Sequence, residues 1–262
     1  MHTRFNLRTR VPRDGEVPYI RYTARIAHRS GNSPLLSTRR SFCLDSARVK
    51  RFSLVFAVSA LVLCGCGAVG TDVDLRAELL EMGRADQEVR GRLMAVVTPG
   101  DPTSFRTEEA QNVIEEMAAV DEKNQLRLDE IVSQRGWPGA RSFGSEAASA
   151  ALLIIQHSGV ETKERYLSIL RQAVEDGEEE PAPLAQLEDE VSVAKTGYQI
   201  YGTEISLDTG VPVLVPIQDP EGLERRRAEM GLQPIAEYRR DADKNAIEEF
   251  GVAVDWSALS PE

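Results

Sequence analysis

Apolar residues after position 73 recur mostly at helical spacing. Five of them predict the buried face of a first helix that ends near residue 97: Leu75, Leu79, Met82, Val89 and Leu93. A second stripe predicts a helix over residues 107–135, with Gly136 placed to cap it and Pro138 to stop it. Further helices are expected over 145–157, 162–176 and from 181 onward, and the apolar run in 145–157 marks the most buried one.

The periodicity changes near residue 198. Residues 198–201 and 211–215, joined across 208–210, predict a small hairpin. Asp219 and Pro220 then have the residue types of an N-cap and first turn for a sixth helix up to Gly231, and 234–249 is a charged helical segment. The predicted fold class is therefore mainly α: a bundle-like domain of about six helices over 74–250, with the hairpin inserted before the last helices, and a tail at 251–262.

Charge divides the 262-residue chain sharply. Its formal net charge is −11, yet residues 1–65 hold 12 basic against three acidic residues and 66–262 hold 19 against 39. The first part is thus +9 and the second −20. A body so acidic repels nucleic acid and anionic lipid surfaces, which excludes a DNA- or RNA-binding module.

The start of the chain predicts a secretory signal. A basic stretch at 49–51 precedes a mainly apolar run of twelve residues at 52–63, which is too short to span a bilayer as a helix. The next residues, Leu63-Cys64-Gly65-Cys66, resemble the lipobox of bacterial lipoproteins, with Cys64 at a position where Ala, Ser, Val or Thr is commoner. The resemblance implies cleavage before Cys66, a diacylglycerol on its sulfur and acylation of its amine. The alternative is a transmembrane anchor or a buried helix.

The lipoprotein interpretation makes residues 49–65 the signal peptide and 66–73 a tether. It implies a protein anchored in the cell membrane or outer membrane, with its domain outside the cytoplasm. Residues 1–48 hold ten Arg and no Lys, and we interpret them as a misassigned N-terminal extension, with Val49 as an alternative initiator. A transit peptide, also rich in Arg and Ser, is the rival interpretation. After processing, Cys66 is the remaining cysteine and His157 the remaining histidine, which excludes a disulfide and a cysteine-type zinc site.

Polar residues interrupt the apolar stripes of two consecutive helices. Asp86 occupies a position on the apolar stripe of the first helix, and Arg90 follows it one turn later. Asp121 and Asn124 occupy positions on the apolar stripe of the second helix. A carboxylate directed at a core costs several kcal/mol unless it is paired or hydrogen-bonded. The two interruptions therefore predict a shared polar cluster, to which His157 at the end of the most buried helix could contribute.

Roughly residues 75–240 resemble a bacterial domain family of unknown function. Five short motifs carry the resemblance, because they occur here in the same order as in that family. The motifs are Asp86-Gln87-x-x-Arg90, Asp121-x-x-Asn124, Gly136-Trp137-Pro138, Gln156-His157 and Tyr201-Gly202-Thr203. The resemblance implies a domain identity but no activity. This sequence departs from the family where an acid followed by Arg is usual, since it has Asp189-Glu190, and where Gln is usual after Tyr-Gly-Thr, since it has Glu204.

Three functions remain open for the predicted cluster. The first is binding of a small polar ligand or a partner's loop by Asp86, Gln87, Arg90, Asp121, Asn124, Gln156, His157, Tyr201 and Thr203. The second is a hydrolase-like enzyme with His157 as general base near Asp86 or Asp121. A metal-dependent version would suit Mn, Fe or Mg better than Zn, but we expect no cofactor and no metal. The third is a purely structural envelope protein whose cluster fixes helix register.

Each candidate also has a purely structural interpretation. Asp86 and Arg90 can form a helix–helix ion pair, Trp137 can cover the edge of the core, and His157 can cap a helix C-terminus. Asp121 and Asn124 can bond to a neighbouring helix end, and Tyr201-Gly202-Thr203 can be a turn. We expect the charged runs 178–180 and 225–227 to be solvated surface.

Overall fold

The structure is a computed structural model that describes residues 5–9, 20–24, 71–98, 101–207 and 210–259. Within these ranges the protein is mainly helical, with eight α-helices and two small antiparallel hairpins. The first hairpin, β1 (Phe5–Thr9) with β2 (Ile20–Ala24), lies in the Arg-rich extension. The predicted signal peptide and Cys66 lie outside the described residues. No helix of the described part is long and apolar enough to cross a membrane.

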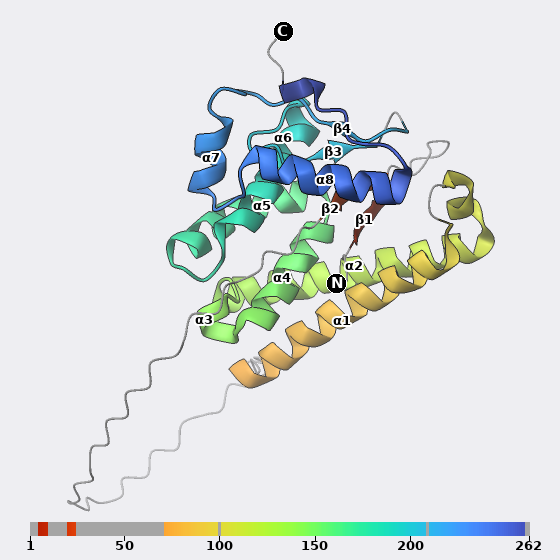
Figure 1. Ribbon diagram of the computed structural model, residues 1–262. Coiled ribbons are helices and arrows are strands. Elements are labelled where there is room, and N and C mark those ends of the chain that lie inside the picture. The colour runs from red at the N-terminus through yellow and green to blue at the C-terminus, as the bar shows by residue number, and fades with distance from the viewer. Residues whose placement is uncertain (1–4, 10–19, 25–70, 99–100, 208–209, 260–262) are drawn as a thin grey trace, which may run out of the picture. The chain divides into compact units, whose positions relative to one another are not determined.

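Two long helices, α1 (Asp72–Val96) and α2 (Glu108–Arg135), lie side by side and antiparallel (Figure 1). Thr71 and Thr107 cap their N-termini with hydroxyl oxygens that accept backbone N–H bonds. A short 3₁₀ helix, η1 (Pro102–Arg106), precedes α2. Gly136 ends α2 with φ of 78°, a conformation that favours glycine, so the predicted helix end is confirmed.

The helix α4 (Ser145–His157) packs on both α1 and α2 and follows the short α3 (Ala140–Phe143). A close approach makes this packing possible: a Cβ on Gly83 of α1 would lie 2.8 Å from the Ala150 side chain of α4. The pair α5 (Val160–Glu175) and α6 (Pro181–Thr196) adds the next layer to the same core. The periodicity predicted all of these helices except α3.

The C-terminal part, residues 199–259, has its own apolar cluster. This C-terminal part comprises β3 (Ile205–Ser206), β4 (Val213–Leu214), α7 (Leu223–Glu229), α8 (Ile235–Phe250) and η2 (Ser257–Leu259). The predicted first strand at 198–201 is wrong, because the strand β3 begins only at Ile205. Residues 200–203 form a loop whose backbone N–H groups donate to the Asp189 side chain. The predicted start of the sixth helix is also wrong: α7 begins after Gly222, and Asp219 instead bonds Arg226. Val254 and Trp256 are buried in this cluster.

Candidate functional site

The seam between α1 and α2 carries two apolar clusters separated by charged residues. Leu79 and Met82 belong to the main core, and Val89 and Leu93 belong to a smaller cluster at the other end of α1. Asp86 lies between the two clusters with only 1% of its side chain exposed. The interruption of the stripe predicted from sequence is therefore a charged group inside the helix interface.

Arg90, one turn after Asp86, turns into the same interface. Its Nη1 donates to Asp86 Oδ1 at 2.9 Å and to the Asp86 carbonyl at 3.2 Å. Its Nη2 donates across to Asp121 Oδ2 of α2 at 2.8 Å. The predicted ion pair is confirmed, and it extends to a second carboxylate. Asn124, one turn after Asp121, donates from Nδ2 to the Met82 carbonyl at 3.1 Å.

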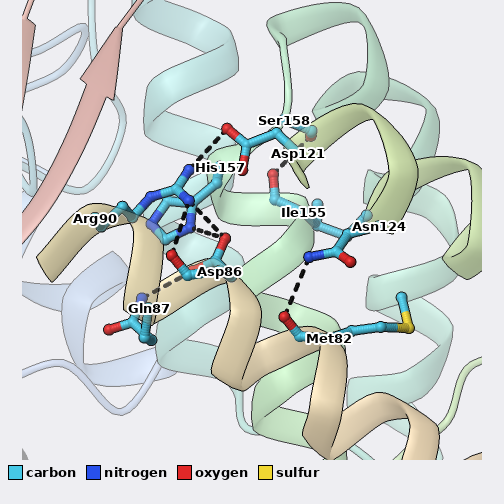
Figure 2. A network of polar contacts seen from close by, with 9 residues as sticks. All are labelled: Met82, Asp86, Gln87, Arg90, Asp121, Asn124, Ile155, His157 and Ser158. Carbon is cyan, nitrogen blue, oxygen red and sulfur yellow. Dashed lines mark hydrogen bonds and ion pairs between the residues drawn. The ribbon is translucent and has the colours of Figure 1, made fainter. Parts of the chain in front are cut away.

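His157 joins this network from the last turn of α4 (Figure 2). Its Nδ1 lies 2.8 Å from Asp86 Oδ1, and its side chain is 1% exposed. Because an ionised carboxylate only accepts, Nδ1 carries the hydrogen in this pair. Gln87 donates from Nε2 to Asp86 Oδ2 at 2.8 Å. Three helices thus bring together the side chains that we call the Asp86 cluster: Asp86, Gln87, Arg90, Asp121 and His157.

Asp121 differs from Asp86, Arg90 and His157 because 24% of its side chain is exposed, against 7% or less for those three. Burial raises the pKa of Asp121 to about 6, with the Asp86 charge adding to the rise and the Arg90 guanidinium opposing it. The Asp121 carboxyl therefore changes charge near neutral pH at the accessible edge of a buried network.

Gln156, the other residue of its motif, is buried, and no hydrogen-bond partner for its Oε1 lies among the described residues. The structure gives Tyr201 and Thr203 partners on α6. The Asp189 carboxylate accepts the backbone N–H groups of Ile200 at 2.6 Å, Tyr201 at 2.8 Å and Thr203 at 3.0 Å, and the Thr203 hydroxyl at 2.7 Å. The Tyr201 hydroxyl donates to Glu188. These bonds, and the φ of 72° at Gly202, support the interpretation of Tyr201-Gly202-Thr203 as a turn.

Arg227 of α7 completes the support of this loop and corrects the prediction that 225–227 is solvated surface. Its side chain is among the most buried in the described part, and it donates to the carbonyls of Tyr201, Gly202 and Gln233. Its guanidinium lies 5.0 Å from the centroid of the Tyr238 ring. The helical spacing of Arg227 from Leu223 was the sequence signal for this burial.

Two more sets of charged residues were missed by the sequence reasoning. Glu178, predicted to be surface, accepts from the backbone N–H groups of Arg141 and Ser142 at the start of α3. Glu190, which follows Asp189 on α6, forms a buried ion pair of 2.8 Å with Lys163 of α5. The Glu190 charge is thus neutralised locally. Spacing along one helix could not reveal either partner.

No group of three or more His, Cys, Asp or Glu residues in the described part is arranged to hold a metal ion. Comparison with known proteins assigns residues 73–249 to a family described as "Family of unknown function (DUF6624)". The match covers more than half of the chain, so the chain belongs to this family. No curated protein and no solved structure matches it.

Proposed function

We propose that this member of the family of unknown function is a lipid-anchored cell-envelope protein whose helical domain binds a small polar ligand or a partner's loop at the Asp86 cluster. The observation that carries the proposal is the contrast between Asp86, fully buried and bonded by Gln87, Arg90 and His157, and Asp121, accessible at the edge. A charged network that only holds helices together does not need a partly exposed carboxylate with a pKa of about 6. Carboxylates with such raised pKa values are more frequent at functional sites.

The membrane anchor in this proposal rests on the lipobox-like Leu63-Cys64-Gly65-Cys66. Two or three acyl chains give stable anchoring, at ~0.8 kcal/mol per buried methylene. The test is labelling of the expressing bacteria with radioactive palmitate. The wild type and the Cys64→Ser variant should incorporate label and sediment with membranes, whereas Cys66→Ser should do neither. Label on Cys66→Ser would contradict anchoring at this residue.

Binding at the cluster is tested by the melting temperature of the full-length protein and its Asp121→Asn and His157→Ala variants. Functional residues are often held at a cost to stability, so unchanged or raised melting in Asp121→Asn would support a binding role. Screened ligands should then raise the melting temperature of the wild type and not of the variant. A loss of several degrees in both variants, with no ligand effect, would favour a purely structural envelope protein.

A hydrolase-like enzyme is the second candidate. It is favoured by the 2.8 Å contact between His157 Nδ1 and Asp86, which orients the imidazole as a carboxylate orients a general base. In this role Asp121 would exchange protons near neutral pH, and Arg90 would steady a developing anion. The enzyme requires turnover of an ester or amide substrate that His157→Ala abolishes without unfolding the protein.

A further inference from the structure

The open edge of the Asp86 cluster presents one accessible carboxylate. Side-chain exposure is 1% for Asp86, 1% for His157 and 7% for Arg90, against 24% for Asp121. A ligand that approaches the folded domain therefore reaches Asp121 before Asp86, Arg90 or His157.

Hydrogen-bonding capacity separates the two carboxylates as well. Both oxygens of Asp86 are occupied: Oδ1 by Arg90 and His157, and Oδ2 by Gln87. Asp121 accepts from Arg90 Nη2 at 2.8 Å, and no other described residue donates to it. A carboxylate offers about four lone-pair sites, so Asp121 keeps room for a further donor.

Arg90 supplies the complementary group. Its Nε is buried and has no hydrogen-bond acceptor among the described residues, although its Nη1 and Nη2 are both bonded. The Nε–H leaves the guanidinium from the edge that it shares with Nη2, the nitrogen bonded to Asp121. A buried donor without an acceptor costs about 1–3 kcal/mol, so an acceptor at this position would be favoured.

We propose that the Asp121 edge binds an amide group, whose oxygen accepts from Arg90 Nε and whose N–H donates to Asp121. This inference rests on the proposed binding function and names its ligand class. Asp121 and Arg90 would contact the ligand, and Asp86 and His157 would be positioning residues that hold the guanidinium in place. The oxygen and the N–H must leave the same side of the amide, as they do in a primary carboxamide, which could be the end group of a peptide or part of a small molecule.

Three planar molecules of nearly equal size test the proposal: acetamide, acetate and acetamidinium. Acetamide offers both an acceptor and a donor, acetate only acceptors, and acetamidinium only donors. The readout is the NMR resonance of the Arg90 Nε–H in the full-length protein, assigned with the Arg90→Lys variant. Acetamide should shift this resonance saturably and bind roughly tenfold more tightly than either analogue, because each analogue loses one of two hydrogen bonds.

The Asp121→Asn variant keeps the shape but lacks the carboxylate, and it should lose acetamide binding by about tenfold or more. Glu122→Gln, which removes an exposed acid from the next position of α2, is the matched control and should bind like the wild type. Glycylglycinamide and nicotinamide, a peptide and a small molecule that each carry a primary carboxamide, then separate the two sources of the amide, since the natural source should bind more tightly than acetamide.

Preferential binding of acetamidinium or acetate would overturn the amide class and leave the binding function intact. If no probe shifts the Arg90 Nε–H resonance, the inference is overturned. The Nε–H would then donate to a bound water and not to a ligand. The binding function itself fails separately, when the melting temperatures of Asp121→Asn and His157→Ala both fall and no screened ligand stabilises the wild type.

Discussion

Asp86 Oδ1 and His157 Nδ1 lie 2.8 Å apart, although 71 positions separate the two residues in the chain. The contact joins α1 to the C-terminal turn of α4, and Arg90 continues it to α2. A single buried carboxylate thereby connects three helices, which accounts for an acid at a core position.

Replacing Asp86 by Ala should therefore lower the free energy of unfolding by about 3–5 kcal/mol, because it leaves a buried guanidinium without its main partner. Urea denaturation of the full-length protein measures this loss. The control is Glu88→Gln on the exposed face of α1, expected to change stability by less than about 0.5 kcal/mol. Equal effects of the two changes would contradict a central role for Asp86.

The pKa of Asp121, raised to about 6, predicts a specific dependence of stability on pH. The native state binds the Asp121 proton more tightly than the unfolded chain, so this group makes stability fall as pH rises from about 4 to 6. The full effect is at most about 3 kcal/mol. Unfolding free energies of the wild type and Asp121→Asn should converge or cross over this interval, with the wild type losing more. Parallel curves for the two proteins would show that Asp121 titrates normally.

Asp189 holds the loop at residues 200–203 with bonds to three backbone N–H groups and one hydroxyl. In Asp189→Asn the amide nitrogen would face donors, so we expect a loss of about 3 kcal/mol or more. Hydrogen exchange should show faster exchange of the Ile200, Tyr201 and Thr203 amides. Thr203→Ser, which keeps the hydroxyl, should be milder than Thr203→Val. Retained amide protection in Asp189→Asn would mean that the loop holds itself.

Arg227 and Arg225 lie on the same helix, α7, but one is buried and the other exposed, so Arg225 provides the control for Arg227. Arg227 is 1% exposed and donates to three carbonyls, whereas the side chain of Arg225 is 70% exposed and pairs with Glu229 on the surface. Replacement of Arg227 by Lys should cost about 2–3 kcal/mol, since an ammonium cannot reach the carbonyls in the planar geometry of a guanidinium. Arg225→Lys should change thermal stability by less than about 0.5 kcal/mol. Similar melting temperatures for both variants would contradict the structural role of Arg227.

The helices, and the inward direction of the polar residues on α1 and α2, follow from the amino-acid sequence alone. Helix ends depend on neighbours in the chain, as at Thr107 and Gly136, and helical spacing alone places Asp86, Asp121 and Asn124 among apolar residues. The family membership also follows from residues in the chain.

The partners of these residues, in contrast, depend on how the helices pack against one another. The contacts of Asp86 with His157, Arg227 with Tyr201, and Lys163 with Glu190 join segments that are distant along the chain. Local spacing predicts which way a side chain points along its own helix, but the atom that it meets depends on how separate helices pack. The same reason explains why the partners of Glu178 were not predicted, and why the loop that Asp189 holds was predicted to be a strand.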